Sequence, residues 1–210
     1  MTTIAVFGGS GRTGRRVVER ALAAGYAVRA LVRDPAKLTI QGDRLTVLRG
    51  DVLDAGAVER TVAGSDAVLS VFGQVKGSPP DLQERGTRAI VAAMRAHGVT
   101  RIVSLSGGGL PAPEDRPKAA DRVIRFLLTV LSGAVLADAR RHLEVLRESG
   151  LEWTVVRGPR LTEAPGVGRA RIGWVGVDAS TQISRDDLAD VLVAQVEDRT
   201  FLHRMPFVSA

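Results

Sequence analysis

The sequence of 210 residues contains no cysteine, so disulfide bonds, thiolate metal ligands and cysteine nucleophiles are all excluded. Histidine occurs only three times, as His97, His142 and His203, and these three do not have the spacing of a metal site. Aromatic residues make up 4% of the chain, which leaves few rings on which nucleic-acid bases can stack. These shortages favour a protein without a metal site.

Lysine is also scarce, since it provides three of the 29 basic residues and arginine provides the other 26. With 23 acidic residues, the formal net charge is +6. A basic balance can indicate a nucleic acid, a membrane surface or a small anionic ligand as the partner. The arginines, however, are spread along the chain among acidic residues and form no basic run interleaved with aromatics. We therefore expect mostly solvated surface, with a few arginines that bind the phosphates of a small molecule, rather than a nucleic acid as the partner.

Long apolar runs are missing as well. The first apolar run is only as long as a strand and ends in glycines, so it does not have the pattern of a signal peptide. The most apolar segment, 119–136, is too short and too interrupted by charged residues and glycine to span a bilayer. The sequence therefore predicts a cytoplasmic protein without a membrane partner, as a monomer or a homodimer.

What the chain does contain is a glycine cluster directly after its first apolar run. The stretch Ile4-Ala-Val-Phe-Gly-Gly-Ser-Gly-Arg-Thr-Gly-Arg-Arg16 is typical of a strand, a tight turn and the start of a helix. Its glycines fall at Gly8, Gly11 and Gly14, and Gly9 offers a second register. Such a turn directs free backbone N–H groups and the positive end of a helix at one point, which suits a pyrophosphate. An ordinary glycine-rich turn is the alternative. We predict that the loop binds a dinucleotide through Gly8, Gly9, Ser10, Gly11, Arg12, Thr13 and Gly14.

The second predicted strand, 27–32, ends in Arg33 and Asp34. An acid at this position of a dinucleotide-binding unit bonds the ribose 2′-hydroxyl of NAD, whereas an arginine suits the 2′-phosphate of NADP. Here the arginine comes first, and Arg12 in the glycine loop offers a second guanidinium to the same phosphate. The pattern favours NADP(H) over NAD; the alternative for Arg33 is an ordinary surface residue.

Further candidate residues also follow predicted strands. Asp51 and Val52 come after the strand 45–48, Phe72 and Gly73 close the strand 66–71, and Ser106 follows the strand 101–105. Strands and helices alternate throughout, which predicts an α/β fold with a doubly wound parallel sheet. In such a sheet these strand ends share one edge, so the candidates converge on one ligand. For Asp51 two roles remain equal, acceptance from an adenine amino group and a turn aspartate.

The second half of the chain adds the predicted substrate side. We interpret the apolar segment 119–136 as helical, either as the wall of an apolar substrate pocket or as a dimer surface. A helix over 134–148 follows, with Asp138, Arg141 and His142 on one face; this face is either surface charge, which we favour, or a site. The strand 151–156 leads to Pro159 and Arg160, and residues 158–183 are predicted to be a small hairpin lobe on the substrate side.

Several motifs together resemble a known family. They are Gly8-Gly-Ser-Gly-Arg-Thr-Gly14, Leu31-Val-Arg-Asp34, Gly50-Asp-Val-Leu53, Glu148-Ser-Gly-Leu151 and Trp153-Thr-Val-Val-Arg157. The chain is similar over its whole length to the atypical short-chain dehydrogenase/reductases with an NAD(P)H-binding domain, among them the biliverdin reductase B/flavin reductase type and, further off, the NmrA-like proteins.

This resemblance implies a three-layer Rossmann fold over residues 1–210, with 158–183 as the small C-terminal lobe. It also implies an NADPH-dependent reductase that transfers a hydride to a flat conjugated acceptor, namely a flavin or quinone, or a tetrapyrrole. The Tyr-x-x-x-Lys pair of the wider family is absent, because Tyr26 is the only tyrosine. The serine and histidine of the flavin reductase relatives are replaced by Gly107 and Arg160, and Ser106 is the nearest hydroxyl.

In this reading Phe72, Gly73, Ser106 and Pro159 line the ribose and nicotinamide of the cofactor. Ser106 orients the carboxamide or the acceptor, and Arg160 attracts an anionic acceptor, so these two are the candidate catalytic residues. Solvent supplies the proton. The alternative is a non-catalytic NADP(H)-sensing regulatory protein of NmrA-like type, in which the apolar segment 119–136 contacts a partner protein.

Overall fold

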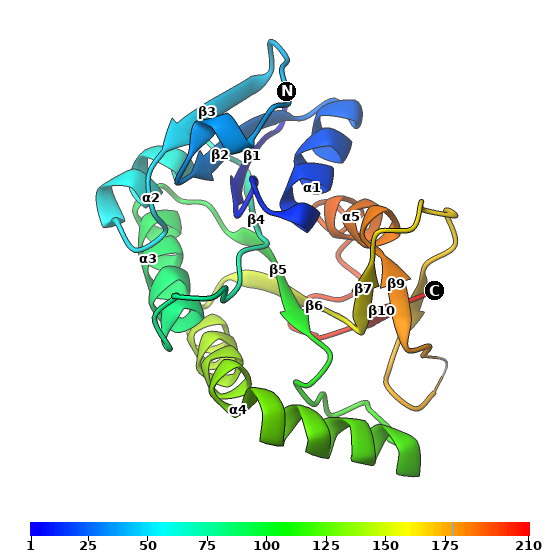
Figure 1. The fold of residues 1–210 in the computed structure, drawn as a ribbon. Coiled ribbons are helices and arrows are strands. Elements are labelled where there is room, and N and C mark those ends of the chain that lie inside the picture. The colour runs from blue at the N-terminus through cyan, green and yellow to red at the C-terminus, as the bar shows by residue number, and fades with distance from the viewer. Residues whose placement is uncertain (178) are drawn as a thin grey trace.

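The computed structural model describes residues 1–177 and 179–210, and for residues 125, 128 and 130 it describes the backbone alone. These three side chains, which belong to the predicted apolar segment 119–136, lie outside the described part, as does residue 178 of the predicted lobe. Strands and helices alternate along most of the chain, as the sequence predicts (Figure 1). Within the described residues, no helix is both long and apolar enough to cross a membrane.

An eight-stranded sheet forms the middle layer of the molecule. Its strand order is β3-β2-β1-β4-β5-β6-β10-β8, and all neighbouring strands are parallel except β10 and β8. The direction of winding reverses between β1 and β4, and open parallel sheets bind ligands at such a point. The strands are β1 (Thr3–Phe7), β2 (Ala27–Val32), β3 (Leu45–Arg49), β4 (Ala67–Ser70), β5 (Arg101–Gly107), β6 (Glu152–Gly158), β8 (Arg171–Gly173) and β10 (Phe207–Ser209).

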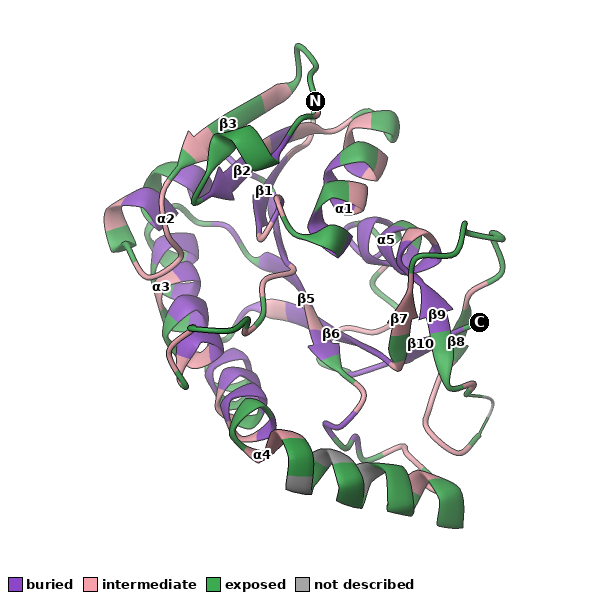
Figure 2. Cartoon of the chain, viewed as in Figure 1, coloured by how far each residue is buried: buried purple, intermediate pink, exposed green. Residues whose placement is uncertain are grey.

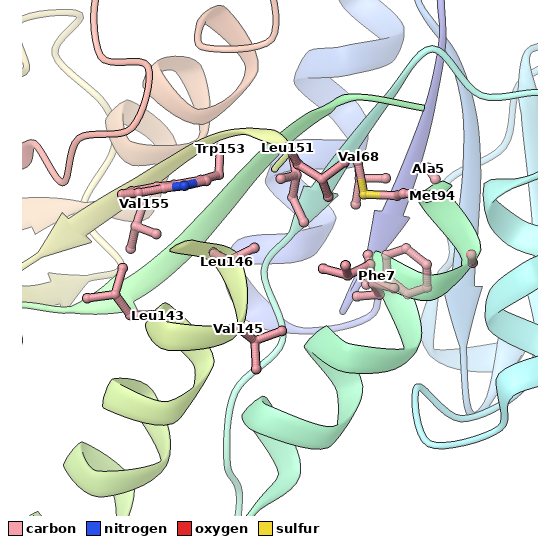
Figure 3. Packing of buried hydrophobic residues seen from close by; sticks show 14 of the residues in the cluster. Ala5, Phe7, Val68, Met94, Leu143, Val145, Leu146, Leu151, Trp153 and Val155 are labelled. Atoms are coloured by element: carbon pink, nitrogen blue, oxygen red, sulfur yellow. The ribbon is translucent and has the colours of Figure 1, made fainter. Parts of the chain in front are cut away.

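Helices cover both faces of this sheet. On one face α1 and α5 pack against each other over a core that includes Val17 and Leu188 (Figure 1). On the other face α2, α3 and α4 cover a core that includes Phe7, Met94 and Leu146 (Figure 3). The three layers confirm the predicted doubly wound Rossmann architecture. The helices are α1 (Arg12–Ala23), α2 (Ala55–Val62), α3 (Leu82–Ala96), α4 (Ala119–Arg147) and α5 (Arg185–Ala194), with a short 3-10 helix at Pro35–Lys37.

The long helix α4 joins two segments that the sequence predicts separately, 119–136 and 134–148. They form one element with a kink at Ser132, whose φ of −136° and ψ of 29° are not helical. The second half packs beside α3, while the first half extends away from the sheet and is largely exposed (Figure 2). Among the described side chains of α4, all the buried ones therefore lie in the second half.

The prediction of a hairpin within 158–183 is wrong. Among the described residues, β7 (Arg160–Thr162) pairs with β9 (Gln182–Ser184) in parallel, and β8 pairs with β10 to extend the main sheet. A parallel pair cannot be closed by a tight turn, so the chain between the two strands has to cross back to the start of β9. The crossover carries β8 and brings residues 163–168 toward α1 and α5, where they contact Arg16 and Asp187.

Candidate functional site

The glycine loop lies between β1 and α1, where two of its glycines are required by close backbone contacts. Gly8 has a φ of +87°, and a Cβ there would lie 2.7 Å from the backbone nitrogen of Phe72. A Cβ on Gly14 would collide with the carbonyl oxygen of Gly8. At Gly9 the nearest atoms would lie 3.4 Å away, which is an ordinary contact. The structure therefore favours the Gly8, Gly11, Gly14 register of the two that the sequence offers.

The start of α1 presents free backbone donors. Gly11 donates to the carbonyl of Gly8 at 3.0 Å, and the first intrahelical bond runs from Arg15 to Gly11 at 2.9 Å. The N–H groups of Arg12, Thr13 and Gly14 therefore precede the first hydrogen bond of the helix. The first turn contains no acidic residue, and none of the side chains that the structure describes caps it. An anion fits this terminus, because the helix dipole and the three donors point to the same place.

Three arginines surround the same helix end and meet at one carboxylate. Arg12, Arg16 and Arg185 lie 3.4, 3.1 and 2.8 Å from the carboxylate oxygens of Glu163. Arg185 also donates to the Thr13 hydroxyl at 2.8 Å. The hydrogen bond from Arg185, with the charges of Arg16 and Arg12, lowers the pKa of Glu163. Arg16 is also paired with Asp186 at 2.7 Å, so Arg12, whose side chain is 69% exposed, is the guanidinium of this group most open to an anionic ligand.

The two residues after β2 differ in what they contact. Asp34 caps the short 3-10 helix by accepting a hydrogen bond from Ala36 at 3.2 Å, and Lys37 lies 3.9 Å from its carboxylate. Arg33 is exposed and makes no hydrogen bond or ion pair within the described residues. The carboxylate at this position is therefore occupied by local structure, whereas the guanidinium is available to a ligand.

The predicted adenine-side residues lie close to Phe72. Asp51 accepts a hydrogen bond from the backbone of Leu53 at 2.9 Å, which is the turn role that the sequence leaves open. Val52 and the Phe72 ring both lie against α3 at Gly86, where a Cβ would come within 3.0 and 2.7 Å of them. Gly86 thus allows α3 to approach the ends of β3 and β4, and Val52 and Phe72 share one wall.

A cleft of about 670 Å³ opens at the carboxyl ends of β4, β5 and β6. It brings together five of the predicted site residues, namely Phe72, Gly73, Ser106, Pro159 and Arg160. The helix α4 provides an apolar wall through Ile124, Val135, Leu136 and Ala139. The glycine loop, Arg33, Asp51 and Val52 are not part of the cleft lining, but Gly8 contacts the backbone of Phe72. The predicted residues therefore form two adjoining parts, a loop for an anion and a cleft for an apolar ligand.

Two polar side chains of the cleft are available to a ligand. Ser106 is 6% exposed, and its hydroxyl has no hydrogen-bond partner within the described residues. A buried hydroxyl without a partner is costly in an empty protein, so it is a natural contact for a bound polar group. Arg160 is exposed on β7 and donates to the Gln182 side-chain oxygen at 2.6 Å, and no counter-ion for its charge lies within residues 1–177 and 179–210 as described.

The segment from Leu110 to Asp115, part of which lines the cleft, is held in place by a buried ion pair that the sequence did not predict. Arg157 is fully buried and donates from both terminal nitrogens to Asp115, at 2.7 and 2.8 Å. Its other bonds reach the carbonyls of Leu110 and Met205, both at 2.7 Å. Burial raises the pKa of Asp115, but hydrogen bonds from Arg157 and from two backbone amides more than offset this and lower it. Arg157 therefore holds the segment from Leu110 to Asp115, part of which lines the cleft, against β6.

The sequence favours surface charge for the polar face of α4, and this interpretation is wrong for two of its three residues. Asp138 and His142 are 0% and 2% exposed, and only Arg141 reaches solvent. Asp138 accepts hydrogen bonds from the backbones of Gln83 and Glu84 at 2.8 and 3.1 Å. The carboxylate thereby caps α3, because the helix's own Asp81 makes no side-chain cap.

His142 lies between two hydroxyl groups in the interior. Its Nδ1 is 2.7 Å from the Thr87 hydroxyl, and its Nε2 is 3.1 Å from that of Ser104. Burial lowers the pKa of His142 to about 4, although the charge of Asp138 opposes the shift. The ring is therefore neutral at physiological pH, and neither it nor its two hydroxyl partners lines the cleft. We assign His142 a structural role.

Sequence reasoning also missed Glu163, Arg16 and Arg185. Glu163 is about 150 residues from the glycine loop, so no local pattern connects the two. Ser184, whose hydroxyl caps α5 by accepting a hydrogen bond from the Asp187 N–H, precedes Arg185 in the chain but indicates only where that helix starts. Within residues 1–177 and 179–210, no group of three or more histidine, aspartate or glutamate side chains lies together in a way that could hold a metal ion.

Comparison with known proteins shows that the chain matches a protein family. A family model described as NAD(P)H-binding matches residues 8–199. A (4-alkanoyl-5-oxo-2,5-dihydrofuran-3-yl)methyl phosphate reductase of Streptomyces griseus is 34% identical over 175 residues, 80% of this chain and 53% of the relative. An uncharacterised chloroplastic protein of Arabidopsis thaliana is 30% identical over 199 residues, 90% of this chain and 69% of that protein. The chain thus spans only about half the length of the Streptomyces relative.

Solved structures agree on the fold. A short-chain dehydrogenase/reductase from Veillonella parvula, crystallised in complex with NADP, superposes with a TM-score of 0.82. The comparison covers 100% of this chain and 94% of the other at 20% sequence identity, a level that shows the fold alone. A protein from Burkholderia pseudomallei gives a TM-score of 0.77 at 25% identity, with 100% of both chains covered. The glycine loop, the family match and the fold all indicate binding of NAD(P)H.

Proposed function

Because the chain belongs to the NAD(P)H-binding family, we propose that it is an NADPH-dependent reductase that transfers a hydride to a flat conjugated acceptor held in the cleft. The acceptor class that we propose is a flavin or a quinone, with a tetrapyrrole as a further member. The observation that carries the proposal is the buried Ser106 hydroxyl, which has no partner in the described residues and lines the cleft at the end of β5.

The residues present fit the cofactor. The free N–H groups of Arg12, Thr13 and Gly14 suit its pyrophosphate, and Gly8 and Gly14 allow the close backbone packing that holds the loop in this conformation. Arg33 and Arg12 are the groups for the 2′-phosphate, which is our reason for NADPH over NADH. On the other side of the loop, Phe72, Gly73, Ser106 and Pro159 would line the ribose and nicotinamide.

The chemistry places small demands on the protein. When bound, NADPH supplies the hydride, and the acceptor takes its proton from solvent. Tyr26 is the only tyrosine and lies on the surface beside α5, where it donates to Glu197 at 2.8 Å, so it cannot protonate a carbonyl in the cleft. Ser106 would orient the carboxamide or the acceptor, and Arg160 would attract an anionic acceptor. A flat conjugated acceptor fits such a site, because stacking in the right geometry provides most of the rate acceleration.

The names of the relatives support the reaction class. The Streptomyces relative is a reductase, and among the shorter matches are a dihydroflavonol 4-reductase of Hordeum vulgare and an isoflavone reductase homologue of Zea mays. The substrate in the first of these names contains an oxo-dihydrofuran ring that carries an alkanoyl group and a methyl phosphate. An unsaturated ring with a carbonyl group agrees with our proposal of a flat acceptor.

The proposal is tested by binding first and by turnover second. Titration with NADPH and NADH should show an affinity difference of at least about tenfold in favour of NADPH, which is about 1.4 kcal/mol. The variant Arg33→Ala should reduce that difference, whereas Arg140→Ala, an exposed arginine on α4, should leave it unchanged. Absence of binding to either cofactor would overturn the proposal.

Turnover is then measured with FMN, a quinone and a tetrapyrrole. The double variant Ser106→Ala, Arg160→Ala should lose at least about tenfold in kcat/KM while still binding NADPH. The exposed Arg171→Ala serves as the matched control. Full turnover in the double variant would show that both assigned roles are wrong.

A second candidate is a non-catalytic NADP(H) sensor that binds a partner protein. The observation that favours it is the exposed apolar side of α4, where Phe126 and Leu131 are 67% and 79% exposed. Tight NADPH binding without turnover of any acceptor would support the sensor over the reductase.

A further inference from the structure

The charge in the cleft is concentrated at one residue. Three ionisable side chains line it within the described residues, namely Asp115, Asp121 and Arg160. The charge of Asp115 is neutralised by its bidentate ion pair with Arg157. Asp121 accepts a hydrogen bond from the backbone of Lys118 at 2.8 Å and lies in the first turn of α4, where the helix dipole offsets its charge. The Arg160 guanidinium donates to the neutral Gln182 amide and has no ion-pair partner among the described residues, so its charge is the one left for a ligand.

The opposite wall of the cleft is apolar and partly open to solvent. Ile124 and Val135 of α4 line the cleft and are 44% and 42% exposed, and Leu136 beside them is buried. Covering such side chains with an apolar group is favourable, because apolar surface is removed from water. Figure 1 places β7, which carries Arg160, and α4 on different sides of the ends of β5 and β6. The cation and the apolar wall thus face a ligand from two sides.

We propose that the acceptor is an amphiphile, with an anionic group bound by Arg160 and an aliphatic or aryl tail laid along Ile124, Val135 and Leu136. This inference names the substrate class of the site and so rests on the proposed function. A flat acceptor without a tail would leave the α4 wall exposed, and a neutral acceptor would leave Arg160 without a counter-ion. The conjugated part lies between the two, beside Ser106.

The probes are straight-chain carboxylates and their matched alcohols. Binding of hexanoate, octanoate and decanoate, with hexan-1-ol and octan-1-ol as uncharged partners, is measured by calorimetry on the NADP+-loaded protein and on the NADP+-free protein. Each added CH₂ should tighten binding by up to about fourfold, the value expected for complete burial of that group. Octanoate should bind more tightly than octan-1-ol.

Matched variants assign the two halves of the ligand. Ile124→Asn should reduce the dependence on chain length, whereas Phe126→Asn, on the same helix but outside the cleft lining, should not. Arg160→Gln should remove the preference for octanoate over octan-1-ol, and Arg171→Gln, an exposed arginine of β8, should keep it. The affinity for NADPH is also measured for each variant, because a variant that no longer folds would no longer bind NADPH.

The outcomes separate this inference from the proposed function. Equal binding of all chain lengths to a protein that binds NADPH and reduces flat acceptors would overturn the inference alone. Tighter binding with chain length to a protein that does not bind NADPH would overturn the proposed function and leave the amphiphile site in place. If the affinity of the Ile124→Asn variant depends on chain length as strongly as that of the unchanged protein, the tail binds elsewhere and our assignment is overturned.

Discussion

The first half of α4, residues 119–131, is among the most apolar stretches of the chain, yet its Phe126 and Leu131 side chains are 67% and 79% exposed. The second half, beyond the kink at Ser132, contains Asp138 and His142, which are 0% and 2% exposed. Figure 2 shows the reason, because only the second half lies beside α3 and over the sheet. Burial here follows the position of the helix on the sheet and not the hydropathy of its residues.

The polar side chains of the second half are tolerated in the interior because each has partners. Asp138 accepts from the backbones of Gln83 and Glu84 and from the Gln74 side chain, the last at 2.7 Å. His142 has a hydroxyl group at each ring nitrogen. Buried polar groups with complete hydrogen bonding cost little, whereas removal of one partner leaves the others unsatisfied. We therefore expect that replacing the polar residues in the second half of α4 destabilises the protein far more than replacing the apolar residues in the first half.

The largest effect is expected for Asp138→Ala. The substitution leaves two backbone donors of α3 without their acceptor, while the Gln74 amide keeps its hydrogen bond to the Pro80 carbonyl at 2.9 Å. We expect a loss of about 3 to 5 kcal/mol in the free energy of unfolding. Asp81→Ala is the matched control, because Asp81 stands at the N-cap of α3 without a side-chain cap and should cost less than about 0.5 kcal/mol. Urea unfolding measures both. Equal losses would show that Asp138 does not cap α3.

The next effect is a pH dependence of stability that arises from His142. Its pKa is lowered from 6.5 to about 4 in the folded state, so between these values the unfolded chain binds more protons than the folded one. The free energy of unfolding therefore rises with pH across this window, and up to about 3 kcal/mol is lost as the pH falls from 6.5 to 4.

The difference between the protein and a His142→Gln variant isolates this contribution. The variant is less stable at neutral pH, because Thr87 and Ser104 lose their ring partner. Its unfolding free energy should change less with pH over the same window, while carboxylates such as Asp115 titrate alike in both. An unchanged pH profile in the variant would show that His142 is not the group responsible.

Local patterns in the sequence predicted much of the fold and of the cofactor loop. Gly8 and Gly14 lie six residues apart within one strand–turn–helix unit, so their spacing alone indicates the geometry. The N-caps Asp54 and Ser184 are local in the same way, since each accepts a hydrogen bond from a backbone N–H two or three residues away. The alternation of strands and helices predicted the parallel sheet, because right-handed crossover connections allow few other arrangements.

The cleft and its supports depend on residues far apart in the chain, and these were not predictable. Arg157 pairs with Asp115 from 42 residues away, and Arg12 meets Glu163 from 151 residues away. The pairing of β7 with β9 and the burial of His142 likewise depend on tertiary packing. The site residues that the sequence did indicate, such as Ser106 and Arg160, follow strands, so topology alone brings them to one edge.

A smaller effect is expected at the junction of the two halves of α4. Within the described part of the chain, no atom lies within 4 Å of a Cβ built on Gly133, and its φ is not positive. Gly133→Ala should therefore stabilise the protein by about 0.4 to 1 kcal/mol through the entropy of the unfolded chain. Gly150→Ala is the control, since it is equally open but has a φ of +70° and should destabilise by about 1 kcal/mol. Thermal unfolding measures both. A loss of stability in Gly133→Ala would show that the kink needs glycine at 133.

The smallest effect is expected for Phe126→Asn in the apolar half. The ring is mostly in water in the folded protein, so its replacement should change the free energy of unfolding by less than about 0.5 kcal/mol. Leu143→Asn, one of the buried residues of the other half, should cost several times more, because a polar amide without partners enters the core. Urea unfolding at two protein concentrations is the measurement. A loss above about 1 kcal/mol for Phe126→Asn that grows with concentration would mean that this half of α4 is covered in solution, since only an association that buries the ring makes the effect depend on concentration.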